Sequence, residues 1–283
     1  MSAANFRQLM GGDELIVAPV ALNPIMARLA EEAGFKAVYL SGGSLGWLKC
    51  VTEANLGVTE MVQVVLDVGG GFGDPVHVQR SVSLCEAAGV AAIELEDQLL
   101  PRRVEHHAGV DHLVPTAFMV EKIKAALAAQ RDPNLVLIAR TNARRVHDLD
   151  EALRRAEAFH AARADMLFIH TRNAEEMRKV GERLPPPLMT FAPPDGFLDY
   201  PLSRGELYRL GYRLAASSGT AFAAMYKAVR QSYECLAQDR KDPLLGAGGA
   251  EPEMKAAMAT TRLAQLLELE RRTMRERDRG GAA

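Results

Sequence analysis

Short apolar segments recur along the chain, and most are followed by a segment whose apolar residues repeat every three or four positions. The apolar segments are LIVAP (15–19), KAVYLSG (36–42), VVLDV (64–68), AAIELED (91–97), NLVLIART (134–141), DMLFIHT (165–171), PLMTFAP (187–193) and YRLAAS (212–217). Strands that are apolar on both faces are typical of parallel sheets buried between helices. Eight such β/α units predict an α/β fold of the (β/α)8 TIM-barrel type.

The second unit and the C-terminal region depart from this pattern. Residues 44–63 are too few, and too interrupted by Gly and Asn, for a full barrel helix, so we expect a shortened or displaced one. After the eighth strand, a long helix is followed by a Gly/Pro-rich linker and an amphipathic helix over 252–277. We therefore expect a barrel over 1–240 and, over 241–283, a linker and a helix that packs on the barrel or on a neighbouring subunit.

The charge balance argues against a polyanionic partner. The chain has 34 Lys and Arg against 36 Asp and Glu, so it has no overall field that would attract nucleic acid or an anionic membrane. Its three cysteines are far apart and lack CxxC spacing, which disfavours a disulfide framework or a zinc site. No segment approaches the 18 apolar residues or so of a membrane span. We expect a cytoplasmic protein.

Polar residues occur where the predicted strands end. In a barrel these carboxyl ends meet at one opening, the mouth, where functional groups gather. The residues at these positions are Tyr39, Ser41, Gly42, Gly43, Asp67, Glu94, Glu96, Asp97, Arg140, Thr141, Asn142 and His170. The sequence therefore predicts a site at the mouth.

Several of these residues suit recognition of an organic anion. Asp67 and Glu96 could share a Mg²⁺ ion, which prefers oxygen ligands, or act only in helix capping and ion pairs. The backbone N–H groups of Ser41–Gly43 could hold a carboxylate or enolate oxygen, or form an ordinary turn. Arg140 could bind a carboxylate or phosphoryl group in a bidentate manner, or pair with an acid on the next strand.

Two further motifs give weaker signals. The segment VGGGFGD (68–74) resembles a phosphate-binding loop, but it lacks GxGxxG spacing and a following Lys. His106 and His107 could transfer protons near neutral pH, although a surface histidine pair in a polar loop is more common.

The segments AGFKAVYLSGG (33–43), IELEDQLLPRR (93–103) and IARTNA (138–143) together resemble the isocitrate lyase and phosphoenolpyruvate mutase superfamily. The resemblance implies a (β/α)8 barrel that assembles as a homo-oligomer, a dimer or a tetramer that exchanges its eighth helix. It also implies a Mg²⁺ ion, with Mn²⁺ as the alternative, that holds an α-keto acid or its enolate. By position, Ser41, Gly42, Gly43 and Tyr39 would bind the pyruvyl end, Asp67 and Glu96 the metal, and Arg140 the far end of the substrate.

The sequence also departs from this family's pattern. The lyases carry a K-R-C-G-H loop whose Cys does acid/base work, whereas Val104 occupies the Cys position here. The metal-binding D-x-D becomes Asp67-Val68-Gly69, and an upstream acid becomes Asn55. His170 replaces the Glu of the lyases and is similar to the His of phosphonopyruvate-processing members.

We predict a Mg²⁺-dependent lyase that cleaves a C–C bond of a small α-keto or α-hydroxy dicarboxylic acid through a pyruvate-like enolate. Decarboxylation and retro-aldol or retro-Claisen cleavage both fit, since neither requires the missing Cys. His106, Glu105 and Arg103 are the candidate catalytic residues, and His170 is a candidate substrate ligand. Two alternatives remain open: P–C bond chemistry on phosphonopyruvate as a hydrolase or mutase, and a catalytically weak binding or assembly barrel.

Overall fold

A computed structural model describes residues 3–50, 67–260 and 263–280. Residues 1–222 form one compact unit and residues 223–283 a second. The predicted boundary at residue 240 and the packing of the predicted terminal helix stay predictions. Among the described residues, no helix combines the length and the apolar character needed to span a membrane.

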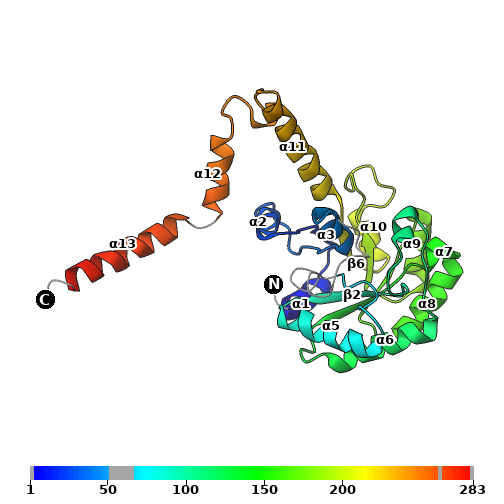
Figure 1. Cartoon of the computed structure of the whole chain (residues 1–283). Helices are drawn as coiled ribbons and strands as arrows, with labels where there is room; N and C mark the ends of the chain where they lie inside the picture. The colour runs from blue at the N-terminus through cyan, green and yellow to red at the C-terminus, as the bar shows by residue number, and fades with distance from the viewer. Residues whose placement is uncertain (1–2, 51–66, 261–262, 281–283) are drawn as a thin grey trace. The chain divides into compact units, whose positions relative to one another are not determined.

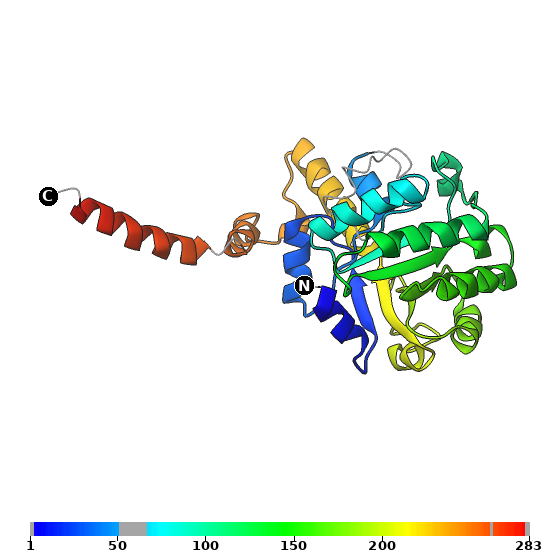
Figure 2. The ribbon, with the colours of Figure 1, turned by 90° about the horizontal axis from the view of Figure 1, so that it is seen from below.

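The first unit alternates strands and helices. Its strands are β1 (Ile16–Pro19), β2 (Ala92–Glu96), β3 (Val136–Thr141), β4 (Met166–Ile169), β5 (Leu188–Phe191) and β6 (Tyr212–Ser217). Its helices are α1 (Ala3–Met10), α2 (Pro24–Glu32), α3 (Gly42–Leu48), α5 (Pro75–Ala87), η2 (Val104–Ala108), α6 (Thr116–Ala129), α7 (Ala143–Val146), α8 (Leu149–Ala161), α9 (Ala174–Arg183) and α10 (Arg204–Arg209). In Figure 1, α5, α6, α8 and α9 lie outside the strands, and Figure 2 shows the same arrangement from a perpendicular direction.

The C-terminal elements are α11 (Thr220–Ala237), η3 (Pro243–Leu245), α12 (Glu251–Ala259) and α13 (Leu263–Gly280). Helix α11 begins in the first unit and contributes most of its length to the second. Large apolar side chains on α11, among them Tyr226, Tyr233 and Leu236, are exposed.

The six strands form one parallel sheet in the order β1-β6-β5-β4-β3-β2. Among the described residues, two isolated parallel bridges extend the sheet, Val20 to Tyr39 and Asp67 to Glu94. The amide of Asp67 also donates to the carbonyl of Leu40 at 3.3 Å, which links the two bridges. Backbone contacts therefore run from β1 through Tyr39 and Asp67 back to β2, as the predicted barrel requires.

The predicted second strand, 36–42, is thus much shorter than its sequence pattern indicates, whereas only Asp67 and Val68 of the predicted third strand, 64–68, are described. The short α3 follows the second strand position, and the expected shortened or displaced helix over 44–63 falls mostly on residues outside the described ones. The remaining part of that unit, including Asn55, lies outside the described residues. The (β/α)8 class predicted from the alternation is confirmed, with six regular strands among the described residues.

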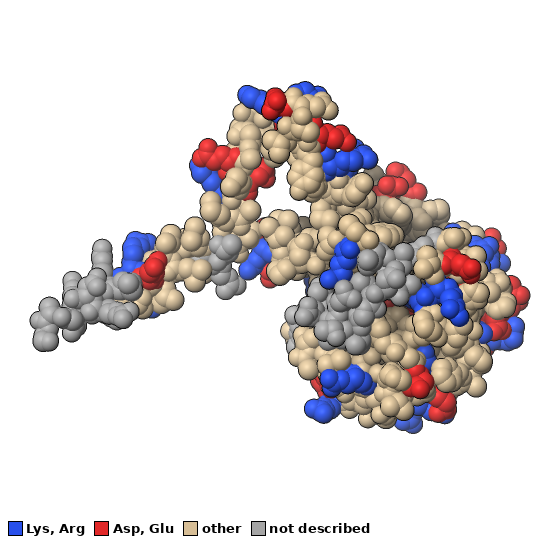
Figure 3. Space-filling model, viewed as in Figure 1, with Lys and Arg blue, Asp and Glu red and all other residues tan. Residues whose placement is uncertain are grey.

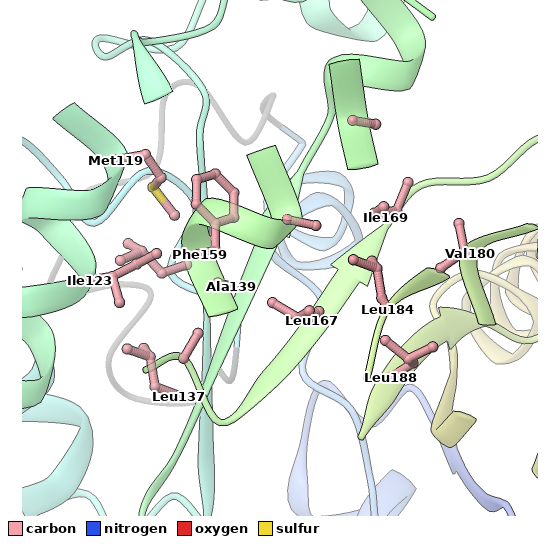
Figure 4. Packing of buried hydrophobic residues seen from close by; sticks show 14 of the residues in the cluster. Met119, Ile123, Leu137, Ala139, Phe159, Leu167, Ile169, Val180, Leu184 and Leu188 are labelled. Atoms are coloured by element: carbon pink, nitrogen blue, oxygen red, sulfur yellow. The ribbon is translucent and has the colours of Figure 1, made fainter. Parts of the chain in front are cut away.

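Side chains alternate between the interior of the sheet and the helix layer. Val136, Ile138 and Arg140 of β3 point to the interior side, and Val136 and Ile138 belong to the interior cluster. The intervening Leu137 and Ala139 pack against the surrounding helices. In Figure 4 they lie near Met119 and Ile123 of α6 and Phe159 of α8. The same alternation places the last interior side chain of each strand at the mouth.

Asp97 ties two layers of the barrel together at the end of β2. It is buried, and it accepts hydrogen bonds from the Thr141 hydroxyl at 2.7 Å and the Asn142 amide at 3.1 Å. Arg155 of α8 reaches the same carboxylate at 3.0 Å and the carbonyl of Val114 at 2.9 Å. Burial raises the pKa of Asp97, against the effect of these donors. We conclude that Asp97 has a structural role.

Replacing Arg155 with Met should therefore lower the free energy of unfolding by about 3 kcal/mol, because it leaves a buried carboxylate without its cation. The neighbouring Arg154 is 64% exposed, and among the described residues it pairs only with Glu151 one turn away, so Arg154→Met should change stability by less than about 0.5 kcal/mol. Urea unfolding of the two variants measures the difference. Equal losses would contradict the assigned role of Asp97.

Candidate functional site

Glu94 and Arg140 form the centre of a buried cluster at the mouth. Glu96 lies directly opposite Arg140 in the parallel register of β2 and β3, and Glu94 precedes Glu96 on the same face. Arg140 Nη1 is 2.7 Å from Glu94 Oε1, and its Nε is 3.4 Å from Glu96 Oε2. Its guanidinium also lies 4.9 Å from the ring centre of Phe168, a cation–π arrangement.

Tyr39 extends the cluster toward the first strands. Its hydroxyl donates to Glu94 Oε2 at 3.0 Å. Burial, together with the charge of Glu94, holds the pKa of Tyr39 well above its usual value, so the phenol stays protonated. Burial and the nearby Asp67 raise the pKa of Glu94 to about 7, although Arg140 acts in the opposite direction. The cluster therefore contains more negative charge than its immediate partners neutralise.

Glu96 is held by groups from two loops. Asn142 Nδ2 donates to Glu96 Oε2 at 2.6 Å, and Arg102 forms an ion pair with Glu96 Oε1. A Cβ atom on Gly69 would lie 3.4 Å from Arg102 Nη2. The arginine therefore lies beside the position where the D-x-D pattern would place its second acid.

Asp67 differs from the two glutamates because the described residues provide it with no arginine partner. Its Oδ1 accepts the Gly69 amide at 2.9 Å, and the residue is buried. Among the described residues, no group of three or more His, Cys, Asp and Glu side chains is arranged to hold a metal ion. Asp67 and Glu96 nevertheless supply hard oxygen donors to a cluster with excess negative charge, which suits a Mg²⁺ ion held partly through water.

Ser41, Gly42 and Gly43 form the start of α3. Ser41 is its N-cap, and the Ser41 hydroxyl accepts the Ser44 amide at 3.3 Å. Ser44 in turn donates its hydroxyl to the carbonyl of Ser218, after β6. The segment is therefore the start of a helix and not an ordinary turn. The first N–H groups of a helix lack intrahelical acceptors.

The segment 98–114, the His106 loop, returns to the sheet edge through an antiparallel bridge between Gln98 and Leu113. Within it, His106 Nδ1 contacts Asp111 Oδ1, and Gln98 Nε2 is 2.8 Å from the same nitrogen. Arg145, after β3, places its Nε 2.8 Å from Asp111 Oδ2. His106 is thus fixed by buried polar groups, and its side chain is 14% exposed.

The other predicted loop residues lie at the surface. Glu105 is exposed and its carboxylate pairs with His112 at 3.1 Å. Arg103 is exposed at the start of η2, and Val104, at the position of the lyase Cys, is 59% exposed. The structure therefore brings Arg102 rather than Arg103 onto the buried acids.

His170 directly follows β4. Its ring packs edge-on against Phe191, with the ring centres 5.5 Å apart. It lines a cavity of about 640 Å³ together with Thr190 of β5 and residues that follow this strand, including Tyr200. Burial, reinforced by the charges of Arg140 and Arg145, lowers the pKa of His170 to about 4, so the imidazole is neutral at pH 7.

The glycine-rich segment 68–74 has a packing explanation. Gly71 has φ +78°, and a Cβ atom there would lie 2.6 Å from Val78 Cγ2. The buried Lys122 donates to the carbonyl of Gly70 at 2.8 Å, and burial lowers the pKa of Lys122 to about 8. These contacts explain the glycines without a bound nucleotide.

The sequence analysis did not single out Gln98, Asp111 or Arg145. Gln98 and Arg145 lie within a few residues of the ends of β2 and β3, so a wider definition of strand ends would have included them. Asp111 is far from any strand end, and no spacing rule indicates its pairing with His106. Lys and Arg alternate with Asp and Glu over the face visible in Figure 3, in agreement with the balanced composition.

Comparison with known proteins places the chain among enzymes of organic-acid chemistry. The family model described as phosphoenolpyruvate phosphomutase matches residues 6–237. The chain is 34% identical to 2,3-dimethylmalate lyase of Eubacterium barkeri over 84% of its length and 87% of that protein. It is 30% identical to oxaloacetate decarboxylase of Chromohalobacter salexigens over 93% of its length and 91% of that protein.

A solved structure also matches. Phosphonopyruvate hydrolase in complex with oxalate and Mg²⁺ is 28% identical and superposes with a TM-score of 0.78, over 96% of this chain and 99% of that one. The likeness extends over nearly the whole of both chains.

The low pKa of His170 predicts an acid-dependent loss of stability. The unfolded chain takes up this proton near pH 6.5, whereas the folded chain takes it up only near pH 4, so lowering the pH through this window favours unfolding. Between pH 7 and pH 4.5, the free energy of unfolding of His170→Asn should therefore fall less than that of the unaltered protein, by on the order of 2 kcal/mol. Urea unfolding at both pH values measures this, with the exposed His160→Asn as the control. Identical pH dependence in the two variants would show that His170 is not held neutral.

Proposed function

Because the chain belongs to the phosphoenolpyruvate phosphomutase family, we propose that it is a divalent-metal-dependent lyase that cleaves a C–C bond of a small α-keto or α-hydroxy dicarboxylic acid. The observation that carries this proposal is the buried cluster of Asp67, Glu94, Glu96 and Arg140 at the mouth. It combines oxygen donors for a hard cation with a guanidinium for a carboxylate. The two relatives found by sequence comparison, a 2,3-dimethylmalate lyase and an oxaloacetate decarboxylase, are both named for reactions of dicarboxylic acids.

Asp67 and Glu96 would hold the metal, with Mg²⁺ as the ion and Mn²⁺ as the alternative. The ion would supply positive charge to the keto or hydroxyl oxygen of the substrate. Arg102 pairs with Glu96, so its guanidinium has to move when Glu96 becomes a metal ligand. Among the described residues, no arginine forms such an ion pair with Asp67.

The chain's own groups would bind the two ends of the substrate. The amides of Gly42 and Gly43, with Ser41 and Tyr39, would hold the pyruvyl-like end. Arg140 retains Nη2, for which the described residues give no hydrogen bond, to reach a carboxylate at the far end. Neutral His170 would accept or donate one hydrogen bond there without adding charge.

Proton transfer is assigned to His106. Val104 cannot replace a thiol in acid/base chemistry, and the exposed Glu105 and Arg103 lie in solvent. His106 is held close to the cluster by side chains from the ends of β2 and β3. When the C–C bond breaks, its imidazole would protonate the carbon that keeps the electron pair.

P–C bond chemistry on phosphonopyruvate is the second candidate. The observation that favours it is the likeness to phosphonopyruvate hydrolase across nearly the whole chain. A neutral His170 contributes no positive charge toward a phosphoryl dianion, which favours the dicarboxylate. Release of inorganic phosphate from phosphonopyruvate, with no turnover of dicarboxylates, would reverse this preference. Turnover of neither class, with no metal-dependent binding of oxalate, would favour a binding or assembly barrel.

A homo-oligomer, either a dimer or a tetramer, is part of the same proposal. The exposed apolar side chains of Tyr226, Tyr233 and Leu236 on α11 support it, since such groups are commonly covered by a partner subunit. Light scattering of the purified chain would determine its mass in solution.

Oxalate binding provides the test of the metal site. Titration calorimetry with oxalate should show binding with Mg²⁺ and none with EDTA, and Asp67→Asn should weaken the Mg²⁺-dependent binding by about tenfold or more. Asp74→Asn is the matched control, because Asp74 is an exposed helix cap close in sequence. Binding that is unaffected by EDTA, or equal in both variants, would contradict the metal assignment.

A further inference from the structure

Asp111 makes several polar contacts within and beyond the His106 loop, and the chemistry proposed above gives it no role. Its side chain is fully buried. Its Oδ1 accepts from Gln98 Nε2 at 2.7 Å and contacts His106 Nδ1, while its Oδ2 lies 2.8 Å from Arg145 Nε. Hydrogen bonding at Oδ1 and the guanidinium beside Oδ2 favour the ionised form of this carboxylate.

This arrangement determines which nitrogen of His106 carries a proton. An ionised carboxylate only accepts hydrogen bonds, so we assign His106 Nδ1 as the donor to Asp111; the Gln98 amide nitrogen, 2.8 Å from the same ring nitrogen, then donates to Asp111 Oδ1 and not to the ring. The neutral imidazole is then the Nδ1–H tautomer, and its exchangeable proton is carried at Nε2. A His–carboxylate contact of this kind orients the ring.

Arg145 fixes the pair to the barrel. Besides its contact with Asp111, it donates from Nη2 to the carbonyl of His106 at 3.3 Å. Arg145 follows β3 by four residues, and the loop is therefore attached to the strand that carries Arg140. The charges of Asp111 and Arg145 both act on His170, and the charge of Arg140 acts on Asp111, so these groups lie around the same mouth.

We propose that Asp111 is the positioning residue that holds His106 as the proton donor of this enzyme, with Arg145 locking Asp111 in place. The inference rests on the proposed lyase function. In the proton-transfer step, the electron pair of the broken C–C bond stays on the substrate carbon and takes the proton from Nε2 of the imidazolium. The ring becomes neutral and keeps its Nδ1 proton, which stays hydrogen-bonded to Asp111. Water restores the Nε2 proton before the next turnover.

The experiment compares His106→Gln, Asp111→Asn and the double variant with oxaloacetate, 2,3-dimethylmalate and phosphonopyruvate as substrates and Mg²⁺ present. With the substrate that the unaltered enzyme turns over, His106→Gln should lower kcat by about 100-fold, and Asp111→Asn by 10- to 100-fold, with KM changed less than about twofold. The double variant should be no slower than His106→Gln, because the two residues act as one unit. Asp150→Asn, with an 80% exposed side chain, is the control and should leave kcat unchanged.

Additive losses in the double variant, or an Asp111→Asn effect confined to KM, would overturn the positioning role. So would an unchanged kcat in His106→Gln. Should Asp111→Asn fail to fold, ¹⁵N NMR of the imidazoles in the unaltered protein at pH 8 decides the matter. The Nδ1–H tautomer of His106 supports the proposal, and the Nε2–H tautomer overturns it. Absence of turnover on every substrate would count against the proposed function, whereas the tautomer would still report on Asp111.

Discussion

Burial of charge at the carboxyl ends of the strands is the constraint on which the site depends. Removing a carboxylate from water costs several kcal/mol, and an ion pair offsets this only if its geometry is good. The parallel register supplies that geometry, because it places Glu96 opposite Arg140 and Glu94 on the same face. Neighbouring strands 4.7–4.9 Å or so apart then bring the charged groups within hydrogen-bonding distance. A shift of register by one residue would turn the acids into the helix layer.

The arginines of the cluster do not neutralise all of its carboxylates. Glu94, Glu96 and Asp67 face the guanidiniums of Arg140 and Arg102, so one negative charge remains. The raised pKa of Glu94, about 7, shows that a proton can neutralise the excess. A divalent cation would neutralise it more fully and would displace both the proton and Arg102. Because Arg102 belongs to the His106 loop, binding of the proposed metal at Glu96 would also affect this loop.

Much of this could be predicted from the sequence, because two simple periodicities determine it. The alternation of apolar segments gave the fold, and the position of polar residues at strand ends gave Tyr39, Asp67, Glu96, Arg140 and His170. The pairings among them could not be predicted, since a strand-end residue has partners on two sides. Nor could the reduction of the strand at 36–42 to a single bridge, because this segment has the same apolar pattern as the regular strands. An apolar pattern indicates that a segment is buried, and the residues at the isolated bridges, Tyr39 and Asp67, are buried like those of the regular strands.

The His106 loop shows where sequence reasoning reaches its limit. Its composition indicates a polar surface connection, and Glu105 and Val104 are indeed exposed. Yet Gln98 and Asp111, 13 residues apart, meet with His106 in a buried network closed by Arg145. A buried network of this kind is stable only when every charged member has a partner, because the low local dielectric penalises any that lacks one. Asp111 is paired with Arg145, so its charge has a cationic partner other than His106. The arrangement therefore suits a proton-transferring histidine better than a purely structural one.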